Sequence, residues 1–188
     1  MIPSVILNTL LVVINIVCTV FALTKLKPNI LFRYFTVLSN LFCAVAAACV
    51  ALAWTRGALP MWVVILKYVA TVAVMVTLVT VFVFLAPVSG EWKKLLSGAD
   101  LFWHLLCPLI AAVSFCAFEH PRFGFGWVFF GVLPVLLYGA FYLSRVLLLP
   151  EGKRMEDFYG FNKTGKWYLS VIFMLLGAFA LSVLLWLI

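Results

Sequence analysis

The sequence predicts an all-α protein, a bundle of six transmembrane helices with both termini on the extracytoplasmic side. Hydrophobic residues make up 67% of the 188 residues and charged residues only 10%, whereas an average soluble domain is about 25% charged. Mean hydropathy is +1.24. These values exclude an ordinary water-soluble fold. Six apolar runs of about 20 residues with short loops use the whole length, so residues 1–188 are predicted to form one integral membrane domain.

Apolar runs separated by polar, glycine- or proline-containing segments define the six predicted spans. In the first, Asn8 and Asn15 are seven residues apart on one helical face, which should therefore face the bundle interior. Pro87 and Gly90 are expected to stop the third, and Asp100 is the expected N-cap of the fourth. The predicted spans cover residues 4–24, 31–55, 61–85, 101–118, 128–149 and 167–188.

The net charge of +7 indicates membrane topology rather than a nucleic-acid partner, because Lys and Arg are scattered through short loops. Loops after the first, third and fifth spans share one side of a six-span bundle. That side should hold Lys25, Lys27, Arg33, Lys93, Lys94, Arg145, Lys153, Arg154, Lys163 and Lys166, and the other side Arg56, Arg122 and Lys67. The positive-inside rule makes the more basic side cytoplasmic.

Metal and disulfide chemistry are not indicated. The five cysteines all lie inside apolar runs and form no C-x-x-C pair, so they are interpreted as small hydrophobic residues. The stretch from Glu119 to Arg122 closes the fourth span, which leaves no expected carboxylate inside the membrane. We therefore expect neither a metal nor a cofactor.

Polar side chains of four predicted spans fall at similar depth near the cytoplasmic side. At a rise of about 1.5 Å per residue, all are within about 12 Å of that side. They are Thr36, Thr80, His104, Tyr142 and Arg145. The outer half offers mainly Asn8 and Lys67. This distribution predicts a polar cavity open to the cytoplasmic leaflet.

The stretch from Arg33 to Asn40 carries the candidate chemistry. On a helix, Arg33, Thr36 and Asn40 fall at i, i+3 and i+7 and share one face. His104 is the only histidine inside an apolar span, and Pro108, four residues on, cannot donate to its carbonyl. Thr36 would be a nucleophile if His104 took its proton.

Asn40, Tyr142 and Arg145 would then stabilise an oxyanion or bind a carboxylate. Simpler roles stay open for each residue. A membrane threonine commonly bonds a carbonyl of its own helix, an asparagine joins helices, and arginines extend to the interface. The residues alone support a six-helix bundle with a polar pocket near the cytoplasmic face.

The stretch Arg33-Tyr34-Phe35-Thr36-Val37-Leu38-Ser39-Asn40, with His104-Leu105-Leu106-Cys107-Pro108, resembles a group of bacterial six-span membrane proteins. More distantly it is similar to the androgen-induced and androgen-dependent TFPI-regulating protein family of eukaryotes. The resemblance implies an integral membrane hydrolase of fatty acid esters of hydroxy fatty acids. It also implies that Thr36 is the nucleophile and His104 the essential histidine.

We therefore expect an intramembrane lipid ester hydrolase in a bacterial cytoplasmic membrane. Thr36 and His104 would be catalytic, and a membrane lipid or fatty acid ester would be the partner. Substrate-binding candidates are Arg33, Asn40, Thr80, Tyr142 and Arg145, and the loop 150–166 would cap the cavity. The alternative is a small transporter or lipid-binding protein that uses the same cavity without catalysis. A structural subunit is a third reading. Neither the oligomeric state nor the natural substrate follows from the sequence.

Overall fold

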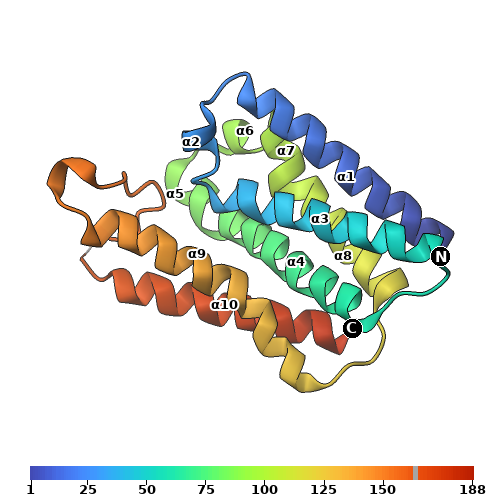
Figure 1. Ribbon diagram of the computed structural model, residues 1–188. Coiled ribbons are helices and arrows are strands. Elements are labelled where there is room, and N and C mark those ends of the chain that lie inside the picture. Colours follow the sequence, from blue (N-terminus) through green and yellow to red (C-terminus); the bar gives the residue numbers. More distant parts are fainter. Residues whose placement is uncertain (163–164) are drawn as a thin grey trace.

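Six apolar helices, each long enough to cross a membrane, make up the protein in the computed structural model, which describes residues 1–162 and 165–188 (Figure 1). Lys163 lies outside the described residues. No strand occurs in the described ranges, so the predicted all-α class and the six spans are confirmed. The spans are α1 (Ile2–Leu23), α3 (Phe35–Thr55), α4 with η1 and α5 (Met61–Ser89), α7 to η3 (Gly98–Glu119), η4 to η5 (Phe125–Leu148), and α10 (Trp167–Leu187).

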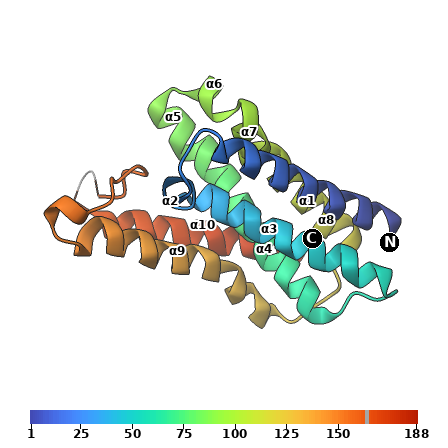
Figure 2. The same ribbon diagram turned by 45° about the horizontal axis from the view of Figure 1, so that its top comes forward.

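The two ends of the bundle differ in the segments that form them. Both termini lie at one end, here called the termini end (Figures 1 and 2). The opposite end, here called the basic end, is formed by segments 24–34, 90–97, 149–162 and 165–166. It includes the short helices α2 (Pro28–Leu31), α6 (Trp92–Leu95) and η6 (Glu151–Lys153).

Helix α4 (Met61–Thr80) is the central element of the bundle. It contacts α3, α8 (Cys107–Ser114), α9 (Leu133–Leu143) and α10, and its span is the most buried of the six. Val72, Ala73 and Val74 are consecutive and fully buried. Ala70 and Thr71, which precede them, are also fully buried, and five consecutive residues at about 100° each point around the whole helix. Helix α4 is therefore enclosed on all sides here. Figures 1 and 2 show α1, α3 and α8 on one flank of α4, and α9 and α10 on the other.

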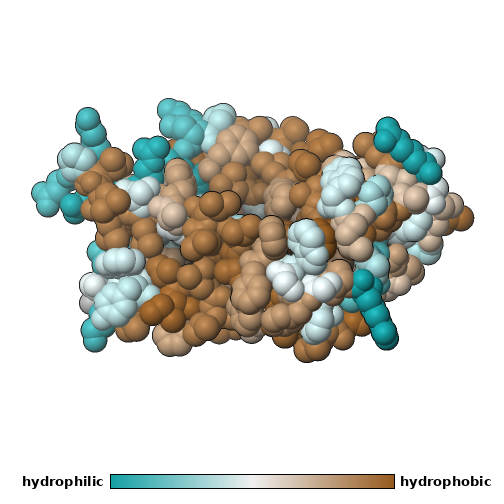
Figure 3. Space-filling view, turned by 60° about the horizontal axis from the view of Figure 1, so that its bottom comes forward, coloured by the Kyte–Doolittle hydropathy of each residue, from teal (hydrophilic) through white to brown (hydrophobic). Residues whose placement is uncertain are grey.

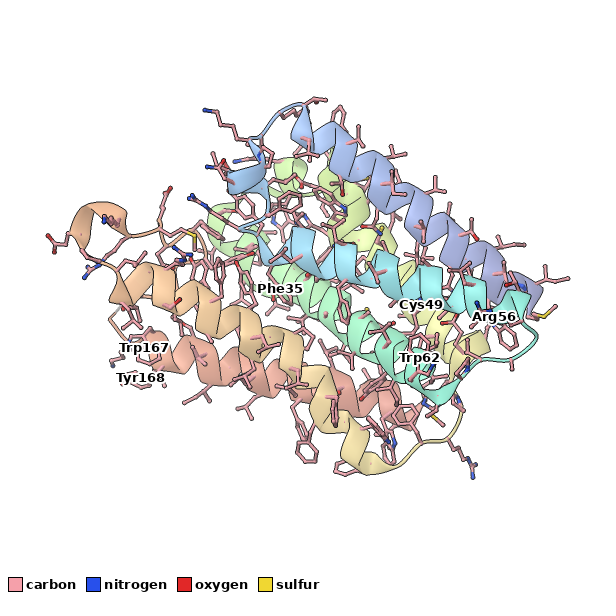
Figure 4. All side chains as sticks on the ribbon, in the orientation of Figure 1. Phe35, Cys49, Arg56, Trp62, Trp167 and Tyr168 are labelled. Atoms are coloured by element: carbon pink, nitrogen blue, oxygen red, sulfur yellow. The ribbon has the colours of Figure 1, made fainter. Side chains whose placement is uncertain are left out.

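The outer surface has the pattern of a membrane-embedded protein. Hydrophobic side chains cover its middle, and hydrophilic ones gather at the two ends (Figure 3). Trp167 and Tyr168 lie at one end of α10, while Trp62 and Arg56 lie at the opposite end of the bundle (Figure 4). Aromatic and basic residues favour the membrane–water interface, so these positions mark the two boundaries of the apolar band.

Two prolines inside spans are each preceded by a π-helical turn. The π-helix η1 (Val81–Leu85) precedes Pro87, and the third span continues to Ser89, so its predicted end at Leu85 is wrong. The π-helix η2 (Phe102–Leu106) likewise precedes Pro108. A proline cannot donate to the carbonyl four residues back, and a π-turn pairs carbonyls with donors five residues on.

Two predicted helix starts are also corrected. The fourth span begins at Gly98 after Ser97, so Asp100 lies in the first turn and is not the N-cap. Helix α3 begins at Phe35 rather than at Leu31, because the backbone of Tyr34 is extended (φ −85°, ψ 131°). Arg33 therefore precedes α3 and does not share a helical face with Thr36 and Asn40.

Helix η4 (Phe125–Val132) approaches α10 closely at Gly131. The Ser182 hydroxyl is fixed there, since it donates to the Val128 carbonyl at 2.7 Å and lies 2.6 Å from the Tyr68 hydroxyl. A Cβ at Gly131 would lie 2.1 Å from Ser182 Oγ and 3.1 Å from Val72 Cγ2. Only glycine fits between α4, η4 and α10 at this point.

Gly131→Ala is therefore expected to destabilise the protein by about 1–3 kcal/mol through overpacking. Gly126→Ala, in the same helix, is the matched control because a Cβ there meets nothing within 4 Å. Thermal unfolding of the purified protein in detergent measures both variants. Equal unfolding midpoints for Gly131→Ala and Gly126→Ala would contradict the close approach at Gly131.

Candidate functional site

Thr36 lines an apolar cavity of about 230 Å³ between the start of α3, the end of α4, and α9 and α10. Thr80, the other threonine of the predicted polar layer, lines the same cavity. Most of the wall is hydrocarbon, contributed by Val81, Leu85, Val135, Leu136, Ala140, Leu143, Val171, Met174 and Leu175. Of the polar residues predicted to meet in one cavity, Thr36 and Thr80 line it together with Thr77, and the cavity is mainly apolar rather than polar as predicted.

The loop between the last two spans closes the basic end of this cavity. Its Tyr159 and Phe161 line the cavity, as expected for a capping loop. The Tyr159 hydroxyl accepts a hydrogen bond from the Phe35 backbone N–H at 3.1 Å, which ties the loop to the first turn of α3. Burial raises the pKa of Tyr159 to about 12, and the Phe35 N–H opposes that rise. The phenol therefore stays neutral at neutral pH and cannot act as a phenolate base.

Asp157 organises this loop. Its carboxylate accepts hydrogen bonds from the Tyr142 hydroxyl at 2.8 Å and from the backbone N–H groups of Phe161 and Asn162 at 2.9 and 2.7 Å. The Tyr142 hydroxyl also accepts from the Tyr159 N–H at 3.0 Å. Tyr142, predicted to bind substrate, is fully buried and holds the loop in place.

His104 lies in the fourth span and is not among the residues that line the cavity. Its Nδ1 is 2.7 Å from the Leu95 carbonyl, which requires a proton on Nδ1 and leaves Nε2 as the acceptor nitrogen. Within the described residues, 1–162 and 165–188, no hydrogen bond joins Thr36 to His104.

Asn40 points toward the fourth span. Its amide donates to the Thr36 carbonyl at 2.8 Å and to the Trp103 carbonyl at 3.1 Å. Both are backbone contacts, and Asn40 is fully buried. The Asn40 amide therefore joins α3 to the residue before His104, an interhelical role that the sequence left open.

Arg33 and Arg145 line a second hollow of about 420 Å³ at the basic end, here called the cationic pocket. Lys153 and Arg154 complete its charged wall, with Asn29 and aromatic side chains around them. The five residues of the predicted polar layer thus lie in four places: Thr36 and Thr80 beside the cavity, Tyr142 against the loop at Asp157, His104 against the Leu95 carbonyl, and Arg145 in the cationic pocket.

A buried charged cluster at the termini end was not predicted. Lys67 Nζ lies 3.9 Å from Glu119 Oε2, and both side chains are fully buried. Lys67 donates to Asn8 Oδ1 at 2.7 Å. Glu119 Oε1 accepts from the hydroxyls of Ser4 and Ser114 and from the Asn8 amide. The expectations of a polar-poor outer half and of no carboxylate inside the membrane are both wrong.

Two sequence signals pointed to this cluster. Ser4 and Asn8 are four residues apart on the face predicted to be buried, and Asn8 and Asn15 are both fully buried, as predicted. Lys67 lies inside the third span and is not a loop residue that reports topology. Glu119 was assigned to a loop, whereas the π-helix η3 (Phe115–Glu119) carries it into the bundle. A lone intramembrane lysine needs a carboxylate partner, and Glu119 is the carboxylate nearest in depth.

No family model matches this sequence, no curated protein matches it, and no solved structure matches it. Within the described ranges, no group of three or more His, Cys, Asp or Glu side chains is arranged to hold a metal ion. The class that the fold defines is thus a six-span integral membrane protein, and the site is argued from its own geometry.

Asp157→Ala is expected to release the loop over the cavity, because it removes one carboxylate that accepts three hydrogen bonds. Hydrogen bonds to charged groups contribute about 1.5–3 kcal/mol each. Trypsin cleavage within segment 150–166 should therefore become about tenfold faster or more.

Glu156→Ala is the matched control for this substitution, because Glu156 is an exposed neighbouring carboxylate. Its cleavage rate should equal that of the wild type. Cleavage of the Asp157 variant at the wild-type rate would show that the carboxylate does not hold the loop.

Proposed function

We propose that this protein binds the hydrocarbon chain of a membrane lipid in the cavity beside Thr36. The observation that carries the proposal is the lining of that cavity, which is hydrocarbon apart from a few hydroxyl groups. Most of these hydroxyls already have partners. The Thr77 hydroxyl lies 3.0 Å from the Ser39 hydroxyl, and the Tyr138 hydroxyl donates to the Arg33 carbonyl at 2.6 Å. The Tyr159 hydroxyl accepts from the Phe35 N–H, and the Thr80 hydroxyl lies 3.8 Å from Met174 Sδ. Such a surface favours an apolar guest over a solvated ion.

The size and position of the cavity also suit a lipid chain. An apolar cavity of about 150 Å³ stays dry and binds benzene, so about 230 Å³ accommodates a longer aliphatic segment. Leu136 lines the cavity and is also 48% exposed on the outer surface of α9. A chain would therefore enter sideways from the surrounding hydrocarbon.

We assign the basic end, where this cavity lies, to the cytoplasmic side of a bacterial cytoplasmic membrane. The described cations Lys25, Lys27, Lys93, Lys94, Lys153, Arg154 and Lys166 are exposed in segments at or near that end. At the termini end the exposed cations are Arg56 and Arg122, since Lys67 is buried. The positive-inside rule favours this orientation, which would place both termini outside.

Gly139→Phe tests chain binding, because Gly139 lines the cavity and a Cβ there meets nothing within 4 Å. The phenyl ring should fill the space and lower affinity for a neutral single-chain probe, parinaric acid methyl ester, by about tenfold or more. Fluorescence titration in detergent measures the affinity.

Gly177→Phe is the matched control, since Gly177 is exposed on α10, does not line the cavity, and also has open space at its Cβ. Its affinity should equal that of the wild type. Equal affinity of the two phenylalanine variants would contradict the proposed chain site.

Ester hydrolysis is a second candidate function, and the position of Thr36 on the cavity wall favours it. An ester chain in the cavity would bring its carbonyl beside the Thr36 hydroxyl. Thr36 Oγ1 would attack the carbonyl carbon while His104 Nε2 takes the proton and passes it to the leaving alkoxide. Water would then hydrolyse the acyl-threonine. This step requires about 3 Å, or one bridging water, between Thr36 and His104.

Hydrolysis predicts that a fluorophosphonate probe labels the wild type. Thr36→Ala should abolish the label, and His104→Ala should reduce it at least about a hundredfold, because general-base catalysis contributes about 10²–10⁴-fold. Thr80→Ala is the matched control, since it removes another hydroxyl from the same cavity. The label, read by in-gel fluorescence, should persist in that control. Absence of label from a wild-type protein that still binds the chain probe would reject hydrolysis and leave lipid binding in place.

A further inference from the structure

The cationic pocket concentrates positive charge without compensation from its own wall. Arg33, Arg145, Lys153 and Arg154 line it, and no Asp or Glu stands among the described residues of the lining. Four like charges around one hollow repel one another. An anion at the centre of the pocket would relieve that repulsion.

The local backbone holds these cations in place. The Met155 N–H donates to the Arg145 carbonyl at 3.0 Å, which folds the start of the loop back against the end of the fifth span. Gly152 makes the turn with a positive φ of 44°. Arg154 Nε donates to the Leu149 carbonyl at 2.8 Å, and the Arg145 guanidinium lies 5.7 Å from the centre of the Phe141 ring. Two guanidinium groups are therefore oriented before any ligand arrives.

The cationic pocket and the apolar cavity share a wall. Tyr138 lines the cavity, and its hydroxyl donates to the carbonyl of Arg33, which lines the pocket. In α9 and η5 (Ser144–Leu148), Gly139 and Leu143 border the cavity while Phe141 and Arg145 border the pocket. The pocket and the cavity therefore lie on the two sides of Tyr138, so a headgroup held in the pocket would lie across this side chain from a chain in the cavity.

The charge of the pocket selects the headgroup. A carboxylate carries one negative charge, whereas a phosphomonoester carries about −1.5 to −2 near neutral pH. Arginine binds phosphate through paired N–H groups, and the pocket offers three arginines and one lysine. We propose that the cationic pocket binds the phosphomonoester headgroup of a single-chain phospholipid from the leaflet at the basic end. This assignment rests on the proposed chain site for the position of the lipid tail.

Native mass spectrometry of the protein in detergent tests phosphate binding in the cationic pocket with three single-chain probes. Lysophosphatidic acid carries a phosphomonoester, oleate a carboxylate and mono-oleoylglycerol no charge. Lysophosphatidic acid should bind at least about tenfold more tightly than oleate. Arg145→Gln and Arg33→Gln should each lower its affinity about tenfold or more, because each removes a charge-assisted hydrogen bond to the phosphate. Affinity for mono-oleoylglycerol should not change.

Lys93→Gln is the matched control, since it removes the same charge from an exposed site that does not line the pocket. If Lys93→Gln and Arg145→Gln lose the same amount of affinity for lysophosphatidic acid, the lipid is attracted by the general surface charge, and binding in the cationic pocket is overturned. Equal affinity for oleate and lysophosphatidic acid would overturn the phosphate assignment. If inorganic phosphate at the same concentration as the lipid displaces it, the claim that the bound phosphate belongs to a lipid is overturned.

Gly139→Phe separates this inference from the chain site. If Gly139→Phe weakens the binding of all three probes while the arginine variants bind them as the wild type does, the proposed phosphate pocket is rejected and the chain site is retained. If the arginine variants weaken lysophosphatidic acid and Gly139→Phe does not, the chain site fails and the phosphate pocket stands as an interfacial site. Thermal unfolding of each variant identifies any loss that arises from misfolding.

Discussion

The buried ion pair between Lys67 and Glu119 is the contact on which the packing of the termini end depends. A charge in a low-dielectric interior is costly unless it is paired and hydrogen-bonded. Here Lys67 comes from the third span and Glu119 from the fourth, while Asn8 of the first span contacts both. Sliding any of these three helices along its axis would separate charges that cannot reach water. The pair therefore restricts the relative register of the spans that carry it.

The second span joins this network through Trp54. Its indole Nε1 donates to Ser4 Oγ at 3.0 Å, and Ser4 Oγ donates to Glu119 Oε1 at 2.7 Å. Four spans thus meet through one set of polar contacts at the termini end. The last two spans are absent from the set and pack on the central helix α4 mainly through apolar contacts and the Tyr68–Ser182 hydrogen bonds. The apolar cavity opens on the flank of α4 where they pack.

The sequence predicted the elements of this architecture but not the connections between its charges. Hydropathy identifies spans because a membrane requires about 20 apolar residues and satisfies backbone groups only within helices. Helical periodicity then placed Asn8 and Asn15 inside, and depth placed Thr36 and Thr80 in one layer. Depth gives no rotation about the helix axis, so His104, Tyr142 and Arg145 were grouped with a cavity that they do not line. Assigning Glu119 to a loop also removed the partner of Lys67, because a difference of one residue at a helix end decided whether that carboxylate was counted inside the membrane.

The interrupted backbone before α3 explains why the cavity and the cationic pocket form together. The sequence predicted a helix through residues 31–34, which would have used the Phe35 N–H and the Arg33 carbonyl in its own hydrogen bonds. The helix instead starts at Phe35, so both groups need partners at the edge of the membrane. The Tyr159 hydroxyl from the capping loop accepts a hydrogen bond from the Phe35 N–H, and the Tyr138 hydroxyl of α9 donates one to the Arg33 carbonyl. Non-helical backbone at this depth is tolerated where protein covers it. The same two tyrosines that satisfy it form part of the cavity wall, so the break in the second span positions the loop, the cavity and the arginine pocket at once.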